Sequence, residues 1–329
     1  MKKIISLVLS AVLAVGCVFS LTACGSKPAS AGKEADTFTV GVCQLVQHEA
    51  LDAATQGFID ALVAEFGDGD KVIVLNENAS NDVQTCTTII NNFVNKNVDL
   101  ILANATPALQ AAVNGTDSIP VLGTSITEYG TALGIDDFDG TVGSNVSGTS
   151  DLAPLDQQAA MVSELFPEAK TVSVLYCTAE ANSGYQVKVI TKELEAKGLT
   201  VVDCGFTDSN DVSAAAAKAA GSDVIYIPTD NTAASCAETI NGVIGDTPVI
   251  AGEENLCKKC GVATLSISYY DLGKKTGEMA VKILKGEANI EEMAIEYAPA
   301  VKEYNKAKCE QLGLDTAALE AAGYTAIAE

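Results

Sequence analysis

The sequence predicts an α/β fold of two doubly wound lobes, each built on a parallel sheet, with a ligand cleft between the lobes. Short β-rich apolar runs alternate with helical patterns from residue 38 onward. This alternation is typical of parallel strands covered by helices on both faces. The same order of runs also occurs twice. The chain has 329 residues, 48% of them hydrophobic, which is enough for two domains with real cores.

The expected strands are short, continuous apolar runs, as buried strands are. They lie at 38–42, 72–75, 99–103, 120–123, 171–176, 200–204, 223–227, 248–251 and 263–267. Helical stretches separate them, at 49–66, 82–96, 107–114, 154–166, 183–197, 211–220, 232–244 and 270–285. Helical crossovers of this kind are the connections that a parallel sheet requires.

A tetrapeptide marks the same position in both predicted lobes. Ser-Asn-Asp-Val at 80–83 opens a helix that precedes a buried strand, and the same four residues at 209–212 do so again. A loop and a threonine, Thr106 or Thr229, follow each of these strands. In open α/β sheets ligands collect at the C-terminal ends of the strands. We therefore expect a cleft lined by strand-end loops of both lobes.

The beginning of the chain predicts export and anchoring. Two lysines precede an apolar run at 4–21 that ends in Leu-Thr-Ala-Cys, which has the pattern of a secretion signal and resembles a bacterial lipobox. Residues 1–23 are expected to be a signal peptide and Cys24 the lipid-modified first residue of the mature protein; a retained membrane-spanning helix is the alternative. Residues 24–36 predict a flexible tether. The body is expected on the extracellular face of the cell membrane.

The composition argues against several classes of function. The chain carries 43 acidic and 20 basic side chains, a net charge of −23, which argues against nucleic acid as a partner. Every basic side chain is lysine, there is one histidine, and tryptophan is absent. Dinucleotide, P-loop and zinc-protease motifs are missing, as is any nucleophile–base pair. We therefore expect a binding protein without catalytic residues, metal or cofactor.

In the first lobe the candidate ligand contacts are amides, hydroxyls and one imidazole after the predicted strands. They are Gln44, Gln47, His48, Asn104, Thr106, Pro107, Thr124, Ser125 and Thr127. Thr106 and Pro107 predict a helix start, at which the free amides can bind an anion; a plain cap is the alternative. His48 lies where a helix begins, and an ordinary capping role is the alternative to ligand contact.

In the second lobe the candidates add carboxylates. They are Asn182, Ser183, Thr229, Asp230, Asn231 and Glu253. A carboxylate that faces a helix start suits a zwitterion, with Asp230 for the ammonium and Thr106 or Ser183 for the carboxylate. Two alternatives remain open: Asp230 and Asn231 cap the following helix, and Glu253 is solvated.

One cysteine pair has a metal-like spacing. Cys257 and Cys260 form a single Cys-x-x-Cys, and a zinc site would want a second pair. We therefore expect buried thiols or a local disulfide here.

Six short motifs carry a family resemblance. They are Gln-His-Glu-Ala-Leu-Asp-Ala at 47–53, Ala-Thr-Pro-Ala at 105–108, Glu-Ala-Asn-Ser at 180–183, Pro-Thr-Asp-Asn-Thr at 228–232, Ala-Gly-Glu-Glu at 251–254 and Tyr-Tyr-Asp-Leu-Gly at 269–273. Together they resemble the substrate-binding lipoproteins of ABC importers in the tryptophan/tyrosine-binding group, over about residues 38–310. The resemblance implies a type I periplasmic-binding-protein fold with three crossovers between the lobes.

The resemblance also implies boundaries, ligand and partners. The N-terminal lobe would comprise 37–147 and 268–288, and the C-terminal lobe 148–267 and 289–329. The expected protein is a monomer that closes by hinge motion on an aromatic amino acid (Trp, Tyr or Phe). It would deliver the ligand to the permease and ATPase of an ABC importer while its lipid anchor holds it at the membrane. A sugar or nucleoside ligand, and a sensor that presents its ligand to a receptor, remain alternatives.

Overall fold

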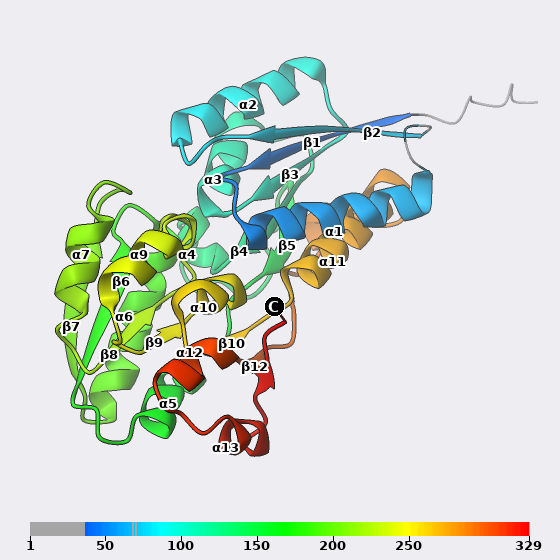
Figure 1. Ribbon diagram of the computed structural model, residues 1–329. Coiled ribbons are helices and arrows are strands. Elements are labelled where there is room, and N and C mark those ends of the chain that lie inside the picture. Colours follow the sequence, from blue (N-terminus) through cyan, green and yellow to red (C-terminus); the bar gives the residue numbers. More distant parts are fainter. Residues whose placement is uncertain (1–36, 68, 70, 329) are drawn as a thin grey trace, which may run out of the picture. The chain divides into compact units, whose positions relative to one another are not determined.

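Two sheets, each covered by helices on both faces, make up the part of the chain that the computed structural model describes, residues 37–67, 69 and 71–328 (Figure 1). The predicted signal peptide, Cys24 and the predicted tether lie outside these residues. Within this range no helix has both the length and the apolar character that crossing a bilayer requires.

The first sheet is parallel and has the strand order β11-β5-β4-β3-β1-β2. Its strands are β1 (Phe38–Gln44), β2 (Val72–Asn78), β3 (Leu100–Asn104), β4 (Val121–Ile126), β5 (Val146–Ser150) and β11 (Glu296–Tyr297). The order 2-1-3-4-5 is that of a doubly wound sheet, so the predicted fold class is confirmed for this lobe.

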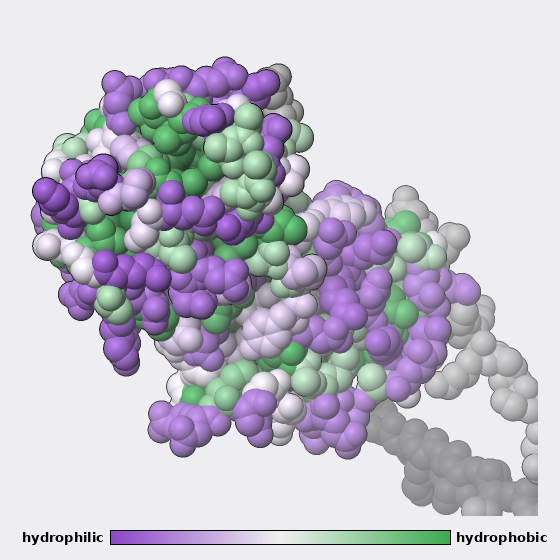
Figure 2. Space-filling view, turned by 90° about the horizontal axis from the view of Figure 1, so that it is seen from below, coloured by the Kyte–Doolittle hydropathy of each residue, from purple (hydrophilic) through white to green (hydrophobic). Residues whose placement is uncertain are grey.

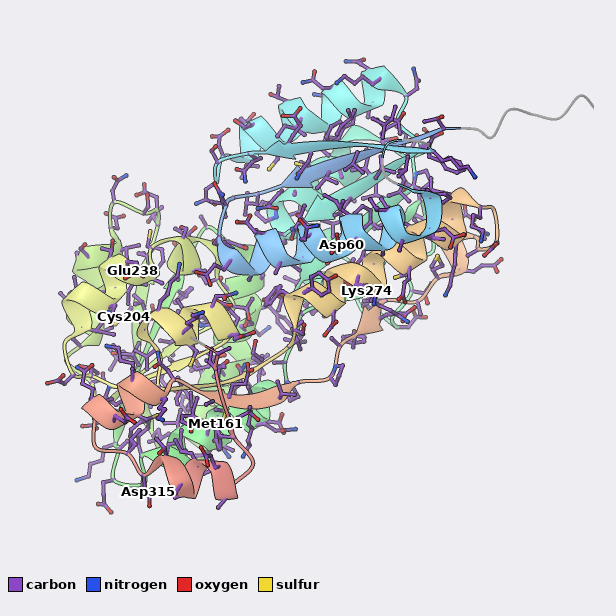
Figure 3. The ribbon with its side chains drawn as sticks, turned by 45° about the vertical axis from the view of Figure 1, so that its right-hand side comes forward. Asp60, Met161, Cys204, Glu238, Lys274 and Asp315 are labelled. Atoms are coloured by element: carbon purple, nitrogen blue, oxygen red, sulfur yellow. The ribbon has the colours of Figure 1, made fainter. Side chains whose placement is uncertain are left out.

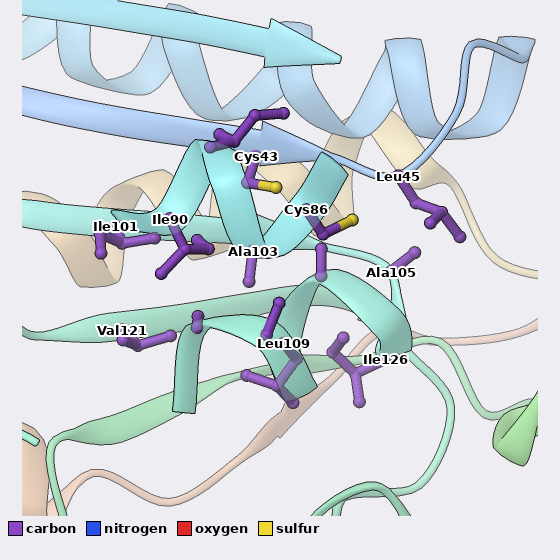
Figure 4. Close-up of a cluster of buried hydrophobic side chains, with 14 of the residues drawn as sticks. Cys43, Leu45, Cys86, Ile90, Ile101, Ala103, Ala105, Leu109, Val121 and Ile126 are labelled. Carbon is purple, nitrogen blue, oxygen red and sulfur yellow. The ribbon is translucent and has the colours of Figure 1, made fainter. Parts of the chain in front are cut away.

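The helices of the first lobe bury the two faces of β1. They are α1 (Glu49–Phe66), α2 (Val83–Lys96), α3 (Thr106–Gly115), α4 (Tyr129–Leu133) and α11 (Tyr269–Leu284). Val40 and Val42 pack with Phe58 of α1 in the cluster that also holds residues of α11. Cys43 points to the other face, into the cluster around α2 and α3 (Figure 4). This alternation is that of a strand covered on both sides.

Helix α11 packs closely along α1. A side chain at Gly273 would collide with the carbonyl oxygen of Ala54, and one at Gly57 would collide with that of Tyr270, so glycine is required for this approach. Figure 3 labels Asp60 on α1 and Lys274 on α11 along this contact. The packing fixes the start of α11, Tyr269, against the first lobe.

The second sheet repeats the order of the first, as β13-β12-β10-β9-β8-β6-β7. Its strands are β6 (Thr171–Cys177), β7 (Thr200–Phe206), β8 (Val224–Ile227), β9 (Val249–Ala251), β10 (Ala263–Ser266), β12 (Val301–Tyr304) and β13 (Thr325–Ala326). Strand β12 pairs antiparallel with β10; the other pairs are parallel. The run β7-β6-β8-β9-β10 is again 2-1-3-4-5, which confirms two lobes of similar topology.

The helices of the second lobe also cover both faces. They are α5 (Leu155–Leu165), α6 (Ala181–Ala196), α7 (Val212–Ala219), α8 (Asn231–Ser235), α9 (Ala237–Ile244), α10 (Glu254–Cys260), α12 (Lys306–Gln311) and α13 (Thr316–Ala321). The 3-10 turn at Ile290–Glu292 belongs to the first lobe, because Ile290 packs in the cluster of β1, α1 and α11. Met161 of α5 is fully buried in one core, labelled in Figure 3. On the surface seen in Figure 2, hydrophilic residues are widespread and hydrophobic ones form smaller areas between them.

The structure corrects several predicted boundaries. The chain passes between the sheets three times, after Ser150, before Tyr269 and after Tyr297. The predicted lobe boundaries placed 148–150 and β11 in the C-terminal lobe, and this is wrong because both pair in the first sheet. Strand β5 was missed because it reads Val-Ser-Gly-Thr-Ser and lacks an apolar run. The predicted helix at 232–244 is divided into α8 and α9.

Candidate functional site

A narrow cavity lies among the strand-end loops of both lobes, with a free volume of about 10 Å³, which is room for about one water molecule. It is lined by His48, Leu51, Ser125, Thr127, Asp151, Asn182, Thr229, Asp230, Asn231, Ala234, Glu253 and Tyr269. Pockets that enclose a small ligand have roughly 300–1,000 Å³, so the site is narrower in this closed arrangement of the lobes than a pocket that encloses a small metabolite. The expected cleft position, at the C-terminal ends of the strands, is where the cavity lies.

The cavity brings together eight of the predicted contacts. They are His48, Ser125, Thr127, Asn182, Thr229, Asp230, Asn231 and Glu253. The sequence did not single out four further lining residues: Leu51, Asp151, Ala234 and Tyr269. Asp151 directly follows the missed strand β5. Tyr269 and Leu51 occur in motifs that carry the family resemblance, which was a signal that could have found them.

Two predicted contacts hold the framework of the first lobe and do not line the cavity. Gln44 accepts a hydrogen bond from the Thr55 hydroxyl at 2.6 Å and donates one to Asp52 Oδ1 at 2.6 Å. Asn104 donates to the carbonyl oxygen of Leu51 at 2.8 Å. These bonds tie the ends of β1 and β3 to α1, and so fix Leu51 at the cavity.

The other predicted contacts outside the lining are Gln47, Thr106, Pro107, Thr124 and Ser183. Gln47 is exposed. Thr124 is not in a loop, because β4 continues to Ile126; its hydroxyl lies 3.4 Å from that of Thr149 inside the sheet. Ser183 is not a helix cap, because α6 begins at Ala181.

Helix α3 begins without a side-chain cap. The predicted cap, Thr106, is the first helical residue, and the cap position is taken by Ala105 at φ 90°. Pro107 lies in the first turn, as predicted. The Thr106 hydroxyl is buried and has no hydrogen-bond partner among the described residues. The start of this helix therefore keeps its capacity to attract an anion.

Two lining residues of the first lobe also carry unused polar atoms. Ser125 has a left-handed backbone, φ 56°, at an irregularity of β4, and its hydroxyl is buried without a partner in the described part. His48 occupies the cap position of α1 and makes no side-chain cap bond. Both of its ring nitrogens are buried and unpartnered there as well. Burial lowers the pKa of His48, so its imidazole is neutral near pH 7.

Asp230 is a fully buried carboxylate that organises the second lobe. It accepts hydrogen bonds from Cys177 N at 2.6 Å, Ser183 Oγ at 2.7 Å and Ala233 N at 2.8 Å. The alternative reading of Asp230 as the cap of α8 is confirmed. Burial and the neighbouring Glu180 raise its pKa to about 7, against the effect of its hydrogen bonds.

Two further acids are bonded in the same way. Glu180 was not predicted as a site residue, yet its two oxygens accept from Asn231 N at 3.1 Å, Asn231 Nδ2 at 2.7 Å and Thr232 N at 2.8 Å. Glu253 caps α10 through Asn255 N at 2.8 Å and Leu256 N at 2.6 Å. Glu253 is buried, not solvated, and burial raises its pKa to about 7.

Asp151 differs from these acids because one of its oxygens is unused. The Tyr269 hydroxyl donates to Asp151 Oδ2 at 2.9 Å. Asp151 Oδ1 is buried and has no partner among the described residues. Burial raises the pKa of Asp151 to about 6, and the bond from Tyr269 partly offsets this. Such an oxygen in a cavity is an acceptor for a cationic donor.

Three contacts join the two lobes beside the cavity. Asn81 Nδ2 donates to Thr232 Oγ1 at 3.2 Å, and Lys259 Nζ lies 3.7 Å from Glu49 Oε1. The amide of Asn255, in the orientation that satisfies its neighbours, donates to Glu49 Oε2 at 2.9 Å and accepts from the backbone N–H at residue 50 at 3.0 Å.

The cysteines of the described part are free thiols. Cys257 and Cys260 lie buried on α10, and Cys260 Sγ is 3.3 Å from the carbonyl oxygen of Leu256. No cluster of three or more His, Cys, Asp or Glu residues within 37–67, 69 and 71–328 could hold a metal ion.

Known proteins resemble this chain over most of its length. A tyrosine-binding protein from Clostridioides difficile (strain R20291) is 37% identical over 298 residues, which are 87% of this chain and 85% of the relative. A Streptococcus pneumoniae ABC domain in complex with L-Trp has a TM-score of 0.83 at 30% identity, covering 89% of this chain and 100% of that one. The ligand-free, open structure of a Clostridium difficile substrate-binding protein with adhesive properties has a TM-score of 0.68 at 36% identity, with the same coverage of 89% and 100%.

The family model for ABC transporter substrate-binding proteins matches residues 39–317. This range contains every strand of both sheets except β13 and the first residue of β1, and every residue that lines the cavity. The chain belongs to the family of ABC transporter substrate-binding proteins.

Proposed function

We propose that this substrate-binding protein captures an aromatic amino acid as a zwitterion and delivers it to an ABC importer. The observation that carries the proposal is a cavity between two lobes with unused polar atoms at several points of its wall. The relatives named for tyrosine and crystallised with L-Trp support the ligand class. Leu51, Ala234 and Tyr269 supply apolar surface for the ring.

The ammonium group of the ligand is assigned to Asp151. Its Oδ1 is the only carboxylate oxygen of the described lining without a hydrogen-bond partner. Asp230, which the sequence favoured for this role, already accepts three hydrogen bonds. It contributes negative charge at the cavity wall and holds Ser183 and Cys177 in place.

The carboxylate of the ligand is assigned to the first lobe. The chain has no arginine, and no lysine lines the cavity in the described part. A ligand carboxylate therefore depends on hydroxyls and backbone amides. Ser125 offers an unused hydroxyl, and α3 begins near the end of the adjacent strand without a side-chain cap. Both are neutral donors, aided by the positive end of a helix.

Capture by hinge closure is supported by the likeness to solved structures. The chain fits the L-Trp complex better than the open, ligand-free structure, although its sequence is closer to the latter. The contacts of Asn81 with Thr232 and of Lys259 with Glu49 join the lobes and would be lost on opening. A ligand that touches both lobes favours the closed form through its additional contacts there.

The sequence and the family support a proposal for the location and partners of the protein. We place the protein on the extracellular face of the membrane, held by lipid at Cys24, as a monomer that docks on a permease and its ATPase. The predicted lobe boundaries, corrected for β5 and β11, give the two bodies that move.

Calorimetric titration with L-tyrosine, L-tryptophan and L-phenylalanine, and with glucose and adenosine as other ligand classes, tests the proposal. We expect micromolar binding of an aromatic amino acid, about −8 kcal/mol, and none of the sugar or nucleoside. Binding of glucose or adenosine alone would replace the proposed ligand class with the alternative.

A further inference from the structure

The described wall of the cavity carries acids and no cationic side chain. Asp151, Asp230 and Glu253 line it, without any lysine. The negative charges of Asp230 and Glu253 are stabilised by the protein itself, because these side chains accept hydrogen bonds from backbone amides at the starts of α8 and α10. Asp151 accepts a hydrogen bond from the Tyr269 hydroxyl, and Thr127 beside it also lowers its pKa, but its Oδ1 has no partner among the described residues. Asp151 is therefore the acid of the wall that is not bonded to the start of a helix.

The unused hydrogen-bonding atoms in the wall favour a donor. Asp151 Oδ1 and Asn182 Oδ1 are buried, unpartnered within the described residues, and can only accept. An ammonium group brings three donors and no acceptor. A ligand carboxylate, which only accepts, finds the Ser125 hydroxyl and the His48 imidazole as unused side-chain groups. More of the unused atoms can therefore accept a hydrogen bond from the ammonium of a zwitterion than can donate one to its carboxylate.

The net charge of the cavity wall also favours a cationic ligand. A zwitterion neutralises Asp151 with its ammonium but brings a second carboxylate into a cavity that already contains acids. Charges interact strongly where water is excluded. A monocation offsets the charge of Asp151 and brings no carboxylate that must be desolvated. The charge of the wall therefore matches a ligand of net charge +1 better than one of net charge zero.

We infer that this cavity also takes a second class of ligand, aromatic monoamines without a carboxylate, the compounds that decarboxylation of aromatic amino acids yields. The inference rests on the proposed function for the place of the ligand. It does not depend on a carboxylate site.

Three probes that differ by one charged group test it with the full mature protein: L-tyrosine, tyramine and 3-(4-hydroxyphenyl)propionate. By calorimetry we expect the Kd of tyramine to lie within about tenfold of that of tyrosine or below it. The propionate, which lacks the ammonium, should bind about 100-fold more weakly than tyramine, the range of a charged hydrogen bond.

The possible results separate the inference from the proposed function. Tyrosine binding without tyramine binding overturns the inference and leaves the function. Tyramine binding without tyrosine binding supports the inference and overturns the function. If neither ligand binds, both fail. Propionate binding as tight as that of tyramine also overturns the inference, because the carboxylate would then dominate.

A matched pair of variants assigns the ammonium contact. Asp151→Asn keeps the shape and removes the charge, and it should weaken tyramine binding about 30-fold. Asp156→Asn makes the same change at an exposed position of α5 and should leave it unchanged. Unchanged tyramine affinity in Asp151→Asn would overturn the assignment. Should this variant fail to fold, the three probes on the natural protein still decide.

Discussion

The two walls of the cavity share a topology but begin their helices differently. In the first lobe α1 and α3 start without a side-chain cap. In the second lobe α8 and α10 start on the buried acids Asp230 and Glu253. The start of a helix attracts negative charge. At α8 and α10 the second lobe supplies that charge from its own sequence, whereas at α1 and α3 the first lobe does not, although its α2 and α4 are capped by Asp82 and Glu128.

Because of this difference, the two sides of the cavity favour ligand groups of opposite charge. At α1 one acceptor comes from the opposite lobe, where Asn255 bonds to the backbone N–H of residue 50. At α3 no side chain takes that place. This difference supports the proposal that a ligand carboxylate binds on the first lobe and a ligand ammonium near Asp151, where the chain first crosses to the second lobe.

Removing an acid from the second lobe should have the largest effect, and on stability. Asp230→Ala should lower the free energy of unfolding by about 3 kcal/mol, because the buried donors of Cys177, Ser183 and Ala233 lose their acceptor. Urea denaturation measures it.

Asp211→Ala is the matched control for that variant. Asp211 occupies the cap position of α7 but is exposed and makes no side-chain cap bond, so its loss should cost less than about 0.5 kcal/mol. Equal destabilisation by both variants would show that Asp230 is an ordinary cap and would remove the contrast between the walls.

The charge of Asp151 should make ligand binding depend on pH. Burial raises its pKa to about 6, and an ammonium ligand needs the charged form. Affinity for L-tyrosine should therefore fall as the pH drops through 6, by up to about tenfold per pH unit. The unliganded protein should change in the opposite sense: its folded form holds the proton more tightly than the unfolded form, so its stability should rise from pH 6 to pH 4.

Calorimetry and thermal melting between pH 4 and 8 measure these two trends. Burial also raises the pKa of Asp230 and Glu253, to about 7, and both shift stability in the same direction. Asp151→Asn separates the contributions, because it should flatten the binding profile while the other two acids remain. A binding profile that keeps its slope in this variant would assign the ammonium contact to Asp230 or Glu253.

The sequence predicted the elements whose signal is local. Apolar runs gave most of the parallel strands, and Asp230 was found because it follows such a run, β8. Strand β5 and Asp151 were missed together. The buried Ser147 and Thr149 of β5 are satisfied by the carbonyl oxygen of Met293 and the hydroxyl of Thr276, more than 100 residues away along the chain. Hydroxyls that are buried by distant partners have no pattern of their own in the sequence.

The roles of the site residues were harder to predict than their places. Thr-Pro at 106–107 marked a helix start correctly, but the cap turned out to be Ala105. Asp230 was placed at the cavity correctly, but its partners Cys177 and Ser183 come from other elements. Whether a polar side chain is used by the fold or left for a ligand depends on such distant contacts.

A smaller effect is expected from the hydroxyl at the first wall. Ser125→Ala should weaken L-tyrosine binding about fivefold, the loss of one neutral hydrogen bond, and should leave tyramine unaffected because tyramine has no carboxylate. Ser163→Ala, at an exposed position of α5, is the control. Equal weakening of both ligands by Ser125→Ala would place the carboxylate elsewhere.

The smallest effect should come from the turn that reaches across the cleft. The two copies of Ser-Asn-Asp-Val differ in use: Asn81, at φ 63°, bonds to Thr232 of the other lobe at 3.2 Å, whereas Asn210 bonds to Asp208 in its own loop at 3.0 Å. Asn81→Ala should weaken every ligand about threefold, because it removes a contact of the closed form and not of the ligand. Asn210→Ala, the same change in the other copy, should have no effect. Small-angle scattering should show a larger open fraction at partial ligand saturation for Asn81→Ala alone; a change that differs between tyrosine and tyramine would instead place Asn81 in contact with the ligand.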